Sequence, residues 1–215
     1  MAPNTLSQIQ QTGTGVAFIV FPLVFVFALH PRLLRPRLLR PEEIMLRVRG
    51  QKLLHLGHAL VLLDTALLVV ASVHFMRILS GSRGAWAGFV GAIPAVLGAI
   101  ILAADKGALC LTMSALDTVP DAEFAAMRPG LLAIFAKKGW LWLLWGIVLL
   151  PAGFAIQTVG LLQAQALPPW QSVLFLVGVL FVGTPDGLEI VNLGASVLMA
   201  IAMVPYGIRL IANAL

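Results

Sequence analysis

Polar and ionisable side chains occur at several places inside or beside long apolar stretches of this sequence, where they could bind a proton, a cation or a small polar solute. They are Asp64, Asp105, Asp186, Glu189, Asn192 and Ser196. An ionisable group is costly to place within an apolar membrane span, and the groups found there commonly mark ion or solute pathways. These residues can form a binding site only if the fold turns their side chains toward the inside of the protein.

Asp64 lies about twelve residues into the apolar stretch 53–79, near its middle. Gly57 and Ala71 stand seven residues to either side, so on a helix the three residues share one face. Small residues let another helix approach, and a carboxyl group facing lipid would be unsatisfied. We therefore expect Asp64 to face protein, either protonated or paired with a donor. It is then either a proton or cation site or a neutral group that holds helices together.

The last apolar stretch carries a polar stripe whose members recur every three or four residues. The stripe comprises Asp186, Glu189, Asn192, Ser196, Met199, Met203 and Tyr206. The other faces of this stretch are almost wholly apolar, so the stripe should face the bundle interior or a wet cavity. Together with Asp64 it predicts the lining of a pathway. Hydrogen bonding between helices, with Met filling gaps, is the alternative.

Small residues form the clearest periodic pattern in the chain. Gly84, Gly88, Gly91, Ala95 and Gly98 follow one another at spacings of three and four residues and include the GxxxG motif "GAWAG". This pattern is typical of a helix-packing face. The face would pack against another helix of this chain, or it would dock a membrane protein partner or a second copy of the chain. Asp105 continues the same stripe and stands beside Lys106, which also suits an interface ion pair.

Three histidines raise the possibility of a b-type haem. His30 closes the first apolar stretch, while His55 and His58 open the second, so ligands at similar depth on facing helices are conceivable. His74 lies about 24 Å along a helix from His58 and cannot share a haem with it. No carboxylate accompanies the histidines at ligand spacing, so we predict no metal site.

Composition identifies the elements that must position these residues. Of 215 residues, 60% are hydrophobic and 11% charged, compared with roughly 45–50% and about 25% in soluble domains. The chain is therefore expected to be a single all-α polytopic transmembrane bundle over 1–215. A span needs about 20 apolar residues. The expected spans are 15–30, 53–79, 86–104 with an extension to 116, 139–162, 171–183 as a short or re-entrant segment, and 188–211.

The placement of basic residues predicts the orientation. No Lys or Arg precedes the first span, whereas the loop 31–52 after it is rich in Arg. Since positively charged loops stay in the cytoplasm, the N-terminus is expected outside. Six spans put eleven of the fourteen Lys and Arg inside, and five spans, with 171–183 re-entrant, put twelve inside. Both counts remain open.

The two cytoplasmic loops have different expected roles. Loop 31–52 sets the orientation and is placed to contact anionic lipid head groups; in a chain of this composition its basic residues do not indicate nucleic-acid binding. The segment "DTVPDAEFAAMRPG" is predicted to be a polar loop with Pro120, Pro129 and Gly130 as helix breakers and a short acidic amphipathic stretch between them.

Enzyme signatures are absent from the sequence. Cys110 is the single cysteine, and no GxSxG, HExxH, phosphate-binding or dinucleotide-binding motif occurs. We expect a small transporter or channel-like protein of a bacterial-type inner (plasma) membrane. The alternative is a non-catalytic accessory or anchoring subunit of a larger membrane complex, either with or without haem b. Because lipid-directed sites are assembled from distant spans, sequence motifs do not decide that activity.

Overall fold

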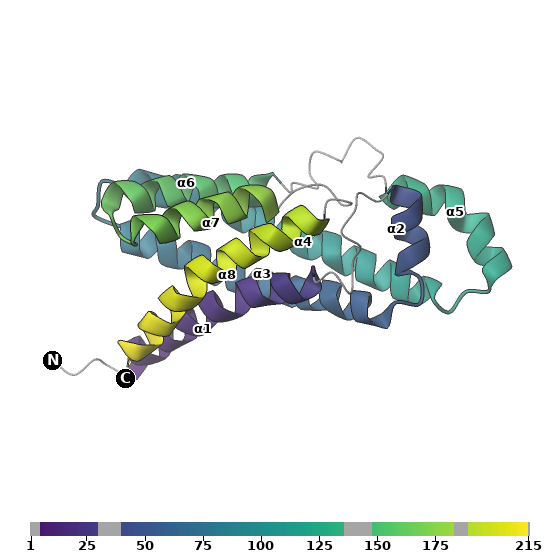
Figure 1. Ribbon diagram of the computed structural model, residues 1–215, viewed down its shortest axis with the longest axis horizontal. Coiled ribbons are helices and arrows are strands. Elements are labelled where there is room, and N and C mark those ends of the chain that lie inside the picture. The colour runs from purple at the N-terminus through teal and green to yellow at the C-terminus, as the bar shows by residue number, and fades with distance from the viewer. Residues whose placement is uncertain (1–4, 30–39, 136–147, 183–188, 215) are drawn as a thin grey trace.

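The computed structural model describes residues 5–29, 40–135, 148–182 and 189–214, and in these ranges the chain forms helices and turns with no strand (Figure 1). The prediction of an all-α protein is thus confirmed. The helices are α1 Thr5–Ala28, α2 Pro41–Val48, α3 Lys52–Leu79, α4 Ala85–Leu116, α5 Asp121–Phe135, α6 Leu149–Ala164, α7 Pro169–Val182 and α8 Glu189–Ala212.

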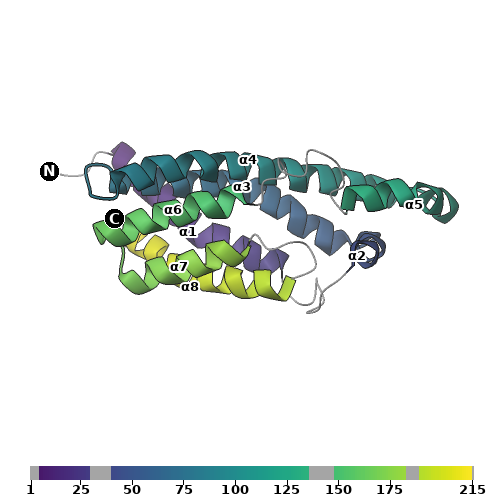
Figure 2. The ribbon, with the colours of Figure 1, turned by 90° about the horizontal axis from the view of Figure 1, so that it is seen from above.

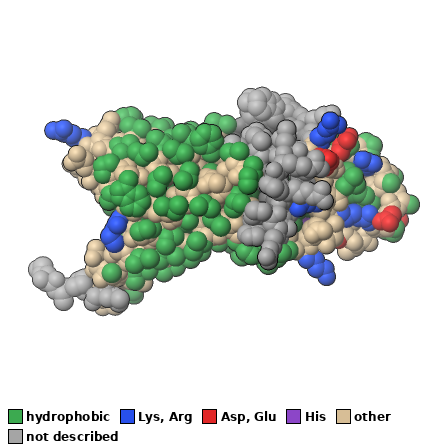
Figure 3. Space-filling model, in the orientation of Figure 1, with side chains coloured by type: hydrophobic (Ala, Val, Ile, Leu, Met, Phe, Trp, Pro, Cys, Tyr) green, Lys and Arg blue, Asp and Glu red, His purple; other side chains and the backbone are tan. Residues whose placement is uncertain are grey.

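Four of these helices, α1, α3, α4 and α8, are long and apolar enough to cross a membrane. Helices α6 and α7 are apolar but shorter over their described residues. On the face seen in Figure 3, apolar side chains cover the middle of the bundle and charged ones gather toward its ends. Large apolar side chains point outward, with Leu63 at 70% and Phe89 at 60% exposure. This surface is consistent with a helical membrane bundle.

Six helices form a closed ring in which each contacts the next, in the order α1, α3, α4, α6, α7, α8 and back to α1. Figure 2 shows them running along the length of the molecule. Neighbours in the ring run in opposite directions. Helix α1 therefore begins, and α8 ends, at the same end of the bundle as the turns at 80–84 and 165–168. We call this the hairpin end, and the opposite end, where α2 and α5 lie, the α2–α5 end.

The centre of the ring is packed with phenylalanine. Five rings, each at most 2% exposed, come from α1, α3, α6 and α7: Phe18, Phe21, Phe75, Phe154 and Phe175. Phe75 and Phe154 each lie within 6 Å of Phe175 between ring centroids, in edge-on geometry. Such contacts favour one arrangement of the helices. In a bilayer, where lipid is as apolar as the core, close packing of this kind replaces water exclusion as the stabilising term.

Glycines allow α4 and α6 to approach closely. A Cβ atom at Gly84 would lie 2.5 Å from the backbone oxygen of Gly160, and one at Gly91 would lie 2.6 Å from that of Gly153. The predicted small-residue face from Gly84 to Gly98 is therefore covered by helices of the same chain, by α6 along most of its length and by α3 at Gly88. The contact between α1 and α8 uses the same device, because a Cβ at Gly15 would lie 2.7 Å from the backbone oxygen of Gly207.

A second apolar cluster joins α2 and α5 to the ends of α3 and α4. It contains Met45, Val48, Leu54, Met113, Leu116, Phe124 and Leu131. Helix α4 is continuous over 32 residues, a length of about 48 Å, which exceeds the roughly 30 Å hydrocarbon thickness of a bilayer. The third apolar stretch and its extension to Leu116 thus form one continuous helix. The C-terminal end of this helix projects beyond the ring and contributes to the second cluster.

Helix α1 begins at Thr5, so the polar residues that precede the expected span 15–30 lie on the same helix. One prediction from the sequence is wrong. The predicted polar loop after Leu116 contains helix α5, with Pro129 and Gly130 inside it. Phe124 and Leu131 are buried in the second cluster, and this packing offsets the hydrogen bond that a proline removes. Much of the expected 31–52 loop and the start of the 139–162 span lie outside the described residues.

Candidate functional site

Asp64 lies on the buried face of α3. This face repeats every three or four residues through Gly57, Val61, Asp64, Leu68 and Ala71. The side chain of Asp64 faces protein, and Asp64 is 2% exposed. Neither of its carboxyl oxygens has a hydrogen-bond partner among the described residues. Most buried polar atoms in proteins do have one, so this carboxyl group is unusual and needs an explanation.

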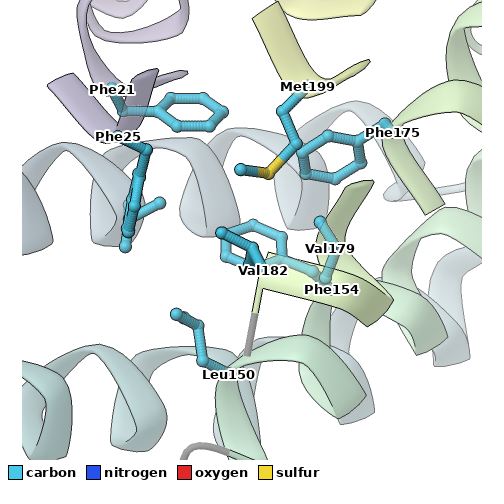
Figure 4. Close-up of a pocket in the computed structure, with 9 residues that line it drawn as sticks. Phe21, Phe25, Leu150, Phe154, Phe175, Val179, Val182 and Met199 are labelled. Atoms are coloured by element: carbon cyan, nitrogen blue, oxygen red, sulfur yellow. The ribbon is translucent and has the colours of Figure 1, made fainter. Parts of the chain in front are cut away.

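A small cavity lies at the centre of the ring beside Leu68, one helical turn from Asp64. Side chains of α1, α3, α6, α7 and α8 converge on it (Figure 4), and all of them are apolar: Phe21, Phe25, Leu68, Leu150, Phe154, Phe175, Val179, Val182 and Met199. Its volume is about 10 Å³, close to the smallest space that holds one water molecule. An apolar space of this kind is normally dry.

The stripe predicted on the last span is turned inward where it is described. Asn192 and Ser196 are buried, as are Met199 and Met203 beyond them. The hydroxyl group of Ser196 donates to the backbone oxygen of Asn192 at 2.7 Å, within α8. Asp186 lies outside the described residues, as does the side chain of Glu189. No hydrogen bond joins Asp64 to the described members of this stripe.

Asp105 has a cationic neighbour on its own helix. Its Oδ2 atom lies 3.3 Å from Nζ of Lys106, and Asp105 is 5% exposed. This pairing matches the interface ion pair considered for these two residues and distinguishes Asp105 from Asp64.

Gln157 is a buried polar residue that the sequence analysis did not single out. Its Nε2 atom donates to the backbone oxygens of Ser72 on α3, at 2.9 Å, and Gly88 on α4, at 3.1 Å. The residue has no exposed surface. Its Oε1 atom, like the hydroxyl group of Ser72, has no partner among the described residues. A single uncharged amide inside "FAIQTVG" is a weak sequence signal for a polar site. The two atoms without partners belong to helices that are far apart in sequence, so neither segment indicates the other.

Polar side chains also close the core at the hairpin end. Nε2 of His74 on α3 and the hydroxyl group of Tyr206 on α8 are hydrogen-bonded at 2.6 Å, and the ring of Phe18 packs against both. Arg209 donates to Oε1 of Gln171 at 2.5 Å, while Nε2 of Gln171 donates to the backbone oxygen of Ala202 at 2.7 Å. These bonds tie together α3, α7 and α8.

Of the three histidines considered as haem ligands, His55 and His58 are described, and His30 lies outside the described residues. Both ring nitrogens of His55 already face protein atoms: Nε2 is 3.1 Å from the backbone oxygen of Val48, and Nδ1 is 3.5 Å from Oδ2 of Asp117. His58 is not free either. In the described ranges, no group of three or more His, Cys, Asp or Glu residues is placed to hold a metal ion.

His55 belongs instead to a polar clasp at the α2–α5 end. Arg49 reaches from the α2–α3 connection to Asp121, at 2.6 Å, and to the backbone oxygen of Val119, at 2.5 Å. Its guanidinium group lies 4.3 Å from the ring centroid of Phe124. Asp117 accepts from the backbone N–H of Gly50 at 2.7 Å. The clasp fixes the α2–α3 connection against the α4–α5 connection.

Asp64 is therefore the described carboxyl group that structural pairing explains least. Ser72, Gln157 and Ser172 also have buried polar atoms without a hydrogen-bond partner among the described residues. Comparison with family models, with curated proteins and with solved structures found no match to this chain, so inference of function depends on the arrangement of these residues.

Proposed function

We propose that this protein is a small membrane transporter or channel-like protein that moves protons, with Asp64 as the proton-binding group. The observation that carries this proposal is the burial of Asp64 with both carboxyl oxygens unpartnered among the described residues. A carboxyl group retained only to join helices is expected to meet a donor on a neighbouring helix. A carboxyl group that binds and releases a proton needs no donor from the protein, because the proton itself neutralises the carboxylate.

The surroundings of Asp64 favour a proton over the other cargoes considered. A polar solute needs a polar, roomy passage, whereas the central cavity is apolar and has a volume of about 10 Å³. A metal cation takes several oxygen ligands, and no cluster of acidic and histidine side chains of that kind occurs in the described ranges. A proton requires only one carboxyl group and water.

The orientation in this proposal has six spans, with both termini outside an inner (plasma) membrane. The α2–α5 end then faces the cytoplasm, and the Lys and Arg residues described there outnumber those at the hairpin end. The latter are Arg77, Arg83 and Arg209. This bias follows the positive-inside rule. The accessory-subunit alternative receives no support from the small-residue face, because α6 and α3 of the same chain already cover it.

Proton flux into liposomes tests the proposal. Purified protein is reconstituted with a pH-sensitive dye inside, and a potassium diffusion potential drives protons inward. We expect acidification with the wild type and background rates with Asp64→Asn, which retains the shape of the side chain without its titratable proton.

Thr65→Val is the matched control. Thr65 is the neighbouring buried residue, and its hydroxyl group donates to the backbone oxygen of Leu62 within α3. This variant should conduct like the wild type. If Asp64→Asn conducted protons as fast as the wild type, Asp64 would not be the proton-binding group.

A further inference from the structure

Two unsatisfied polar atoms belong to residues in direct contact. Gln157 donates its amide N–H to the backbone oxygen of Ser72 at 2.9 Å, so the Oε1 atom of Gln157 and the hydroxyl group of Ser72 lie in the same small region. Both residues have no exposed surface, and neither atom has a partner among the described residues. Buried water characteristically occupies such places, where it makes about three hydrogen bonds to polar atoms left unpaired by the protein.

This pair lies on the hairpin side of the cavity, and Asp64 lies on the other side. Along α3, Leu68 lines the cavity and stands midway between Asp64 and Ser72, which are about 12 Å apart along the helix axis. Along α6, Phe154 lines the cavity and Gln157 follows one turn nearer the hairpin end. Asp64, the cavity and the Ser72–Gln157 pair therefore follow one another along the bundle.

We propose that Ser72 and Gln157 bind a buried water molecule, and that this water exchanges protons with Asp64 through the central cavity. The second part rests on the proposed function. The hydroxyl group of Ser72 and Oε1 of Gln157 hold the water. Because Asp64 and Ser72 are about 12 Å apart along α3, a proton passes between Asp64 and this water only when a short file of hydrogen-bonded water molecules transiently extends through the cavity. When Asp64 releases its proton, its O–H bond breaks, the carboxyl group becomes a carboxylate, and the proton joins the nearest water. Each water then passes one of its own protons to the next, and the excess proton arrives at the water held by Ser72 and Gln157.

Radiolytic labelling tests the water site without reference to transport. Brief X-ray irradiation makes hydroxyl radicals from bound water, and these oxidise adjacent side chains that bulk solvent does not reach. In the wild type we expect oxidation of Phe154 but not of Phe18, which is buried away from the cavity lining. Ser72→Ala should reduce labelling of Phe154 several-fold. Protected Phe154 in the wild type, or equal labelling in Ser72→Ala, would overturn the water site.

Thr158→Val is the control for labelling. Thr158 is as buried as Ser72, but its hydroxyl group donates to the backbone oxygen of Phe154 at 2.7 Å. It therefore has a protein partner and is not expected to bind the proposed water molecule. This variant should label like the wild type. Because the hydroxyl group of Ser72 has no protein partner, Ser72→Ala removes no described hydrogen bond between helices and is expected to fold.

Infrared spectroscopy in D₂O tests the exchange with Asp64. The carboxyl band of protonated Asp64 is identified by its loss in Asp64→Asn, and its deuterium shift is followed with time. We expect exchange about tenfold slower in Ser72→Ala, the effect of losing one hydrogen bond to the water, and unchanged exchange in Thr158→Val. Equal rates in all forms, with proton flux intact, would overturn the relay alone. Absence of the band would overturn both the relay and the proposed function, and labelling would still decide the water site.

Discussion

Gly91 of α4 leaves open the space that the side chain of Gln157 on α6 occupies. A Cβ atom at position 91 would lie 2.7 Å from Cγ of Gln157 and 2.6 Å from the backbone oxygen of Gly153. The missing side chain thus does two things: it brings the helices together, and it lets an amide reach across α4 to the backbone of α3. Packing and the placement of a buried polar group depend on the same residue.

Gly91→Val should destabilise the bundle. Backbone atoms of α6 cannot move aside as a flexible side chain can, so overpacking should lower the free energy of unfolding by about 1–3 kcal/mol or more. Unfolding in mixed micelles measures this. Gly194→Ala is the control, because a Cβ at Gly194 on α8 meets nothing within 4 Å. A similar loss in both variants would contradict the role of the α4–α6 contact.

Asp64→Leu should make the protein more stable while removing the proposed proton flux. The substitution replaces a buried carboxyl group that has no described partner with an apolar side chain of similar size, and we expect the free energy of unfolding to rise by about 1–3 kcal/mol. Thermal unfolding in detergent measures the change, and Thr65→Val should change it little. A strongly destabilised Asp64→Leu would indicate that Asp64 has a structural partner after all.

Arg49→Ala should loosen α2 more than Asp121→Asn does. The side chain of Asp121 is 94% exposed, so solvent screens its ion pair with Arg49, and such exposed pairs contribute about 0–1 kcal/mol. Removing Arg49 also loses its stacking on Phe124 and its bond to the backbone of Val119. Hydrogen exchange of the amides in α2 reports the effect. Equal exchange in the two variants would mean that the ion pair alone fixes the clasp.

Single cysteines in a Cys110→Ser background should establish the orientation in intact cells. With six spans, Ser82→Cys at the hairpin turn and Asn213→Cys after α8 react with an impermeant thiol reagent from outside, whereas Glu123→Cys on α5 reacts only after the cells are opened. Labelling at 82 with protection at 213 would instead support five spans with a re-entrant 171–183 segment.

Sequence periodicity was sufficient for the features that depend on one helix. The seven-residue spacing of Gly57, Asp64 and Ala71 correctly places Asp64 on a buried face, because a helix repeats nearly every seven residues. Helix α5 could not be predicted in this way, since Pro129 and Gly130 oppose a helix locally and only burial of Phe124 and Leu131 against α2 and α4 supports it.

The site itself depends more on pairing between helices than on pattern within one. Ser72 and Gln157 are 85 residues apart in sequence, and nothing in either neighbourhood signals the other. His74 and Tyr206 are further apart still, at 132 residues. Which buried polar atoms find partners, and which do not, follows from the order of helices in the ring, and that order is a property of the whole chain.

The ring closes through its first and last helices, because α1 meets α8 at Gly15 and Gly207. Of the six helices in the ring, α8 is the last to leave the ribosome, so α1 has no neighbour on that side until Gly207 and its flanking residues have been made. Until then the interior of the ring is open on one side. Closure of the ring is therefore a late event in the biosynthesis of these helices: a chain that stops short of Gly207 would hold its first five ring helices without the contact that completes the circle.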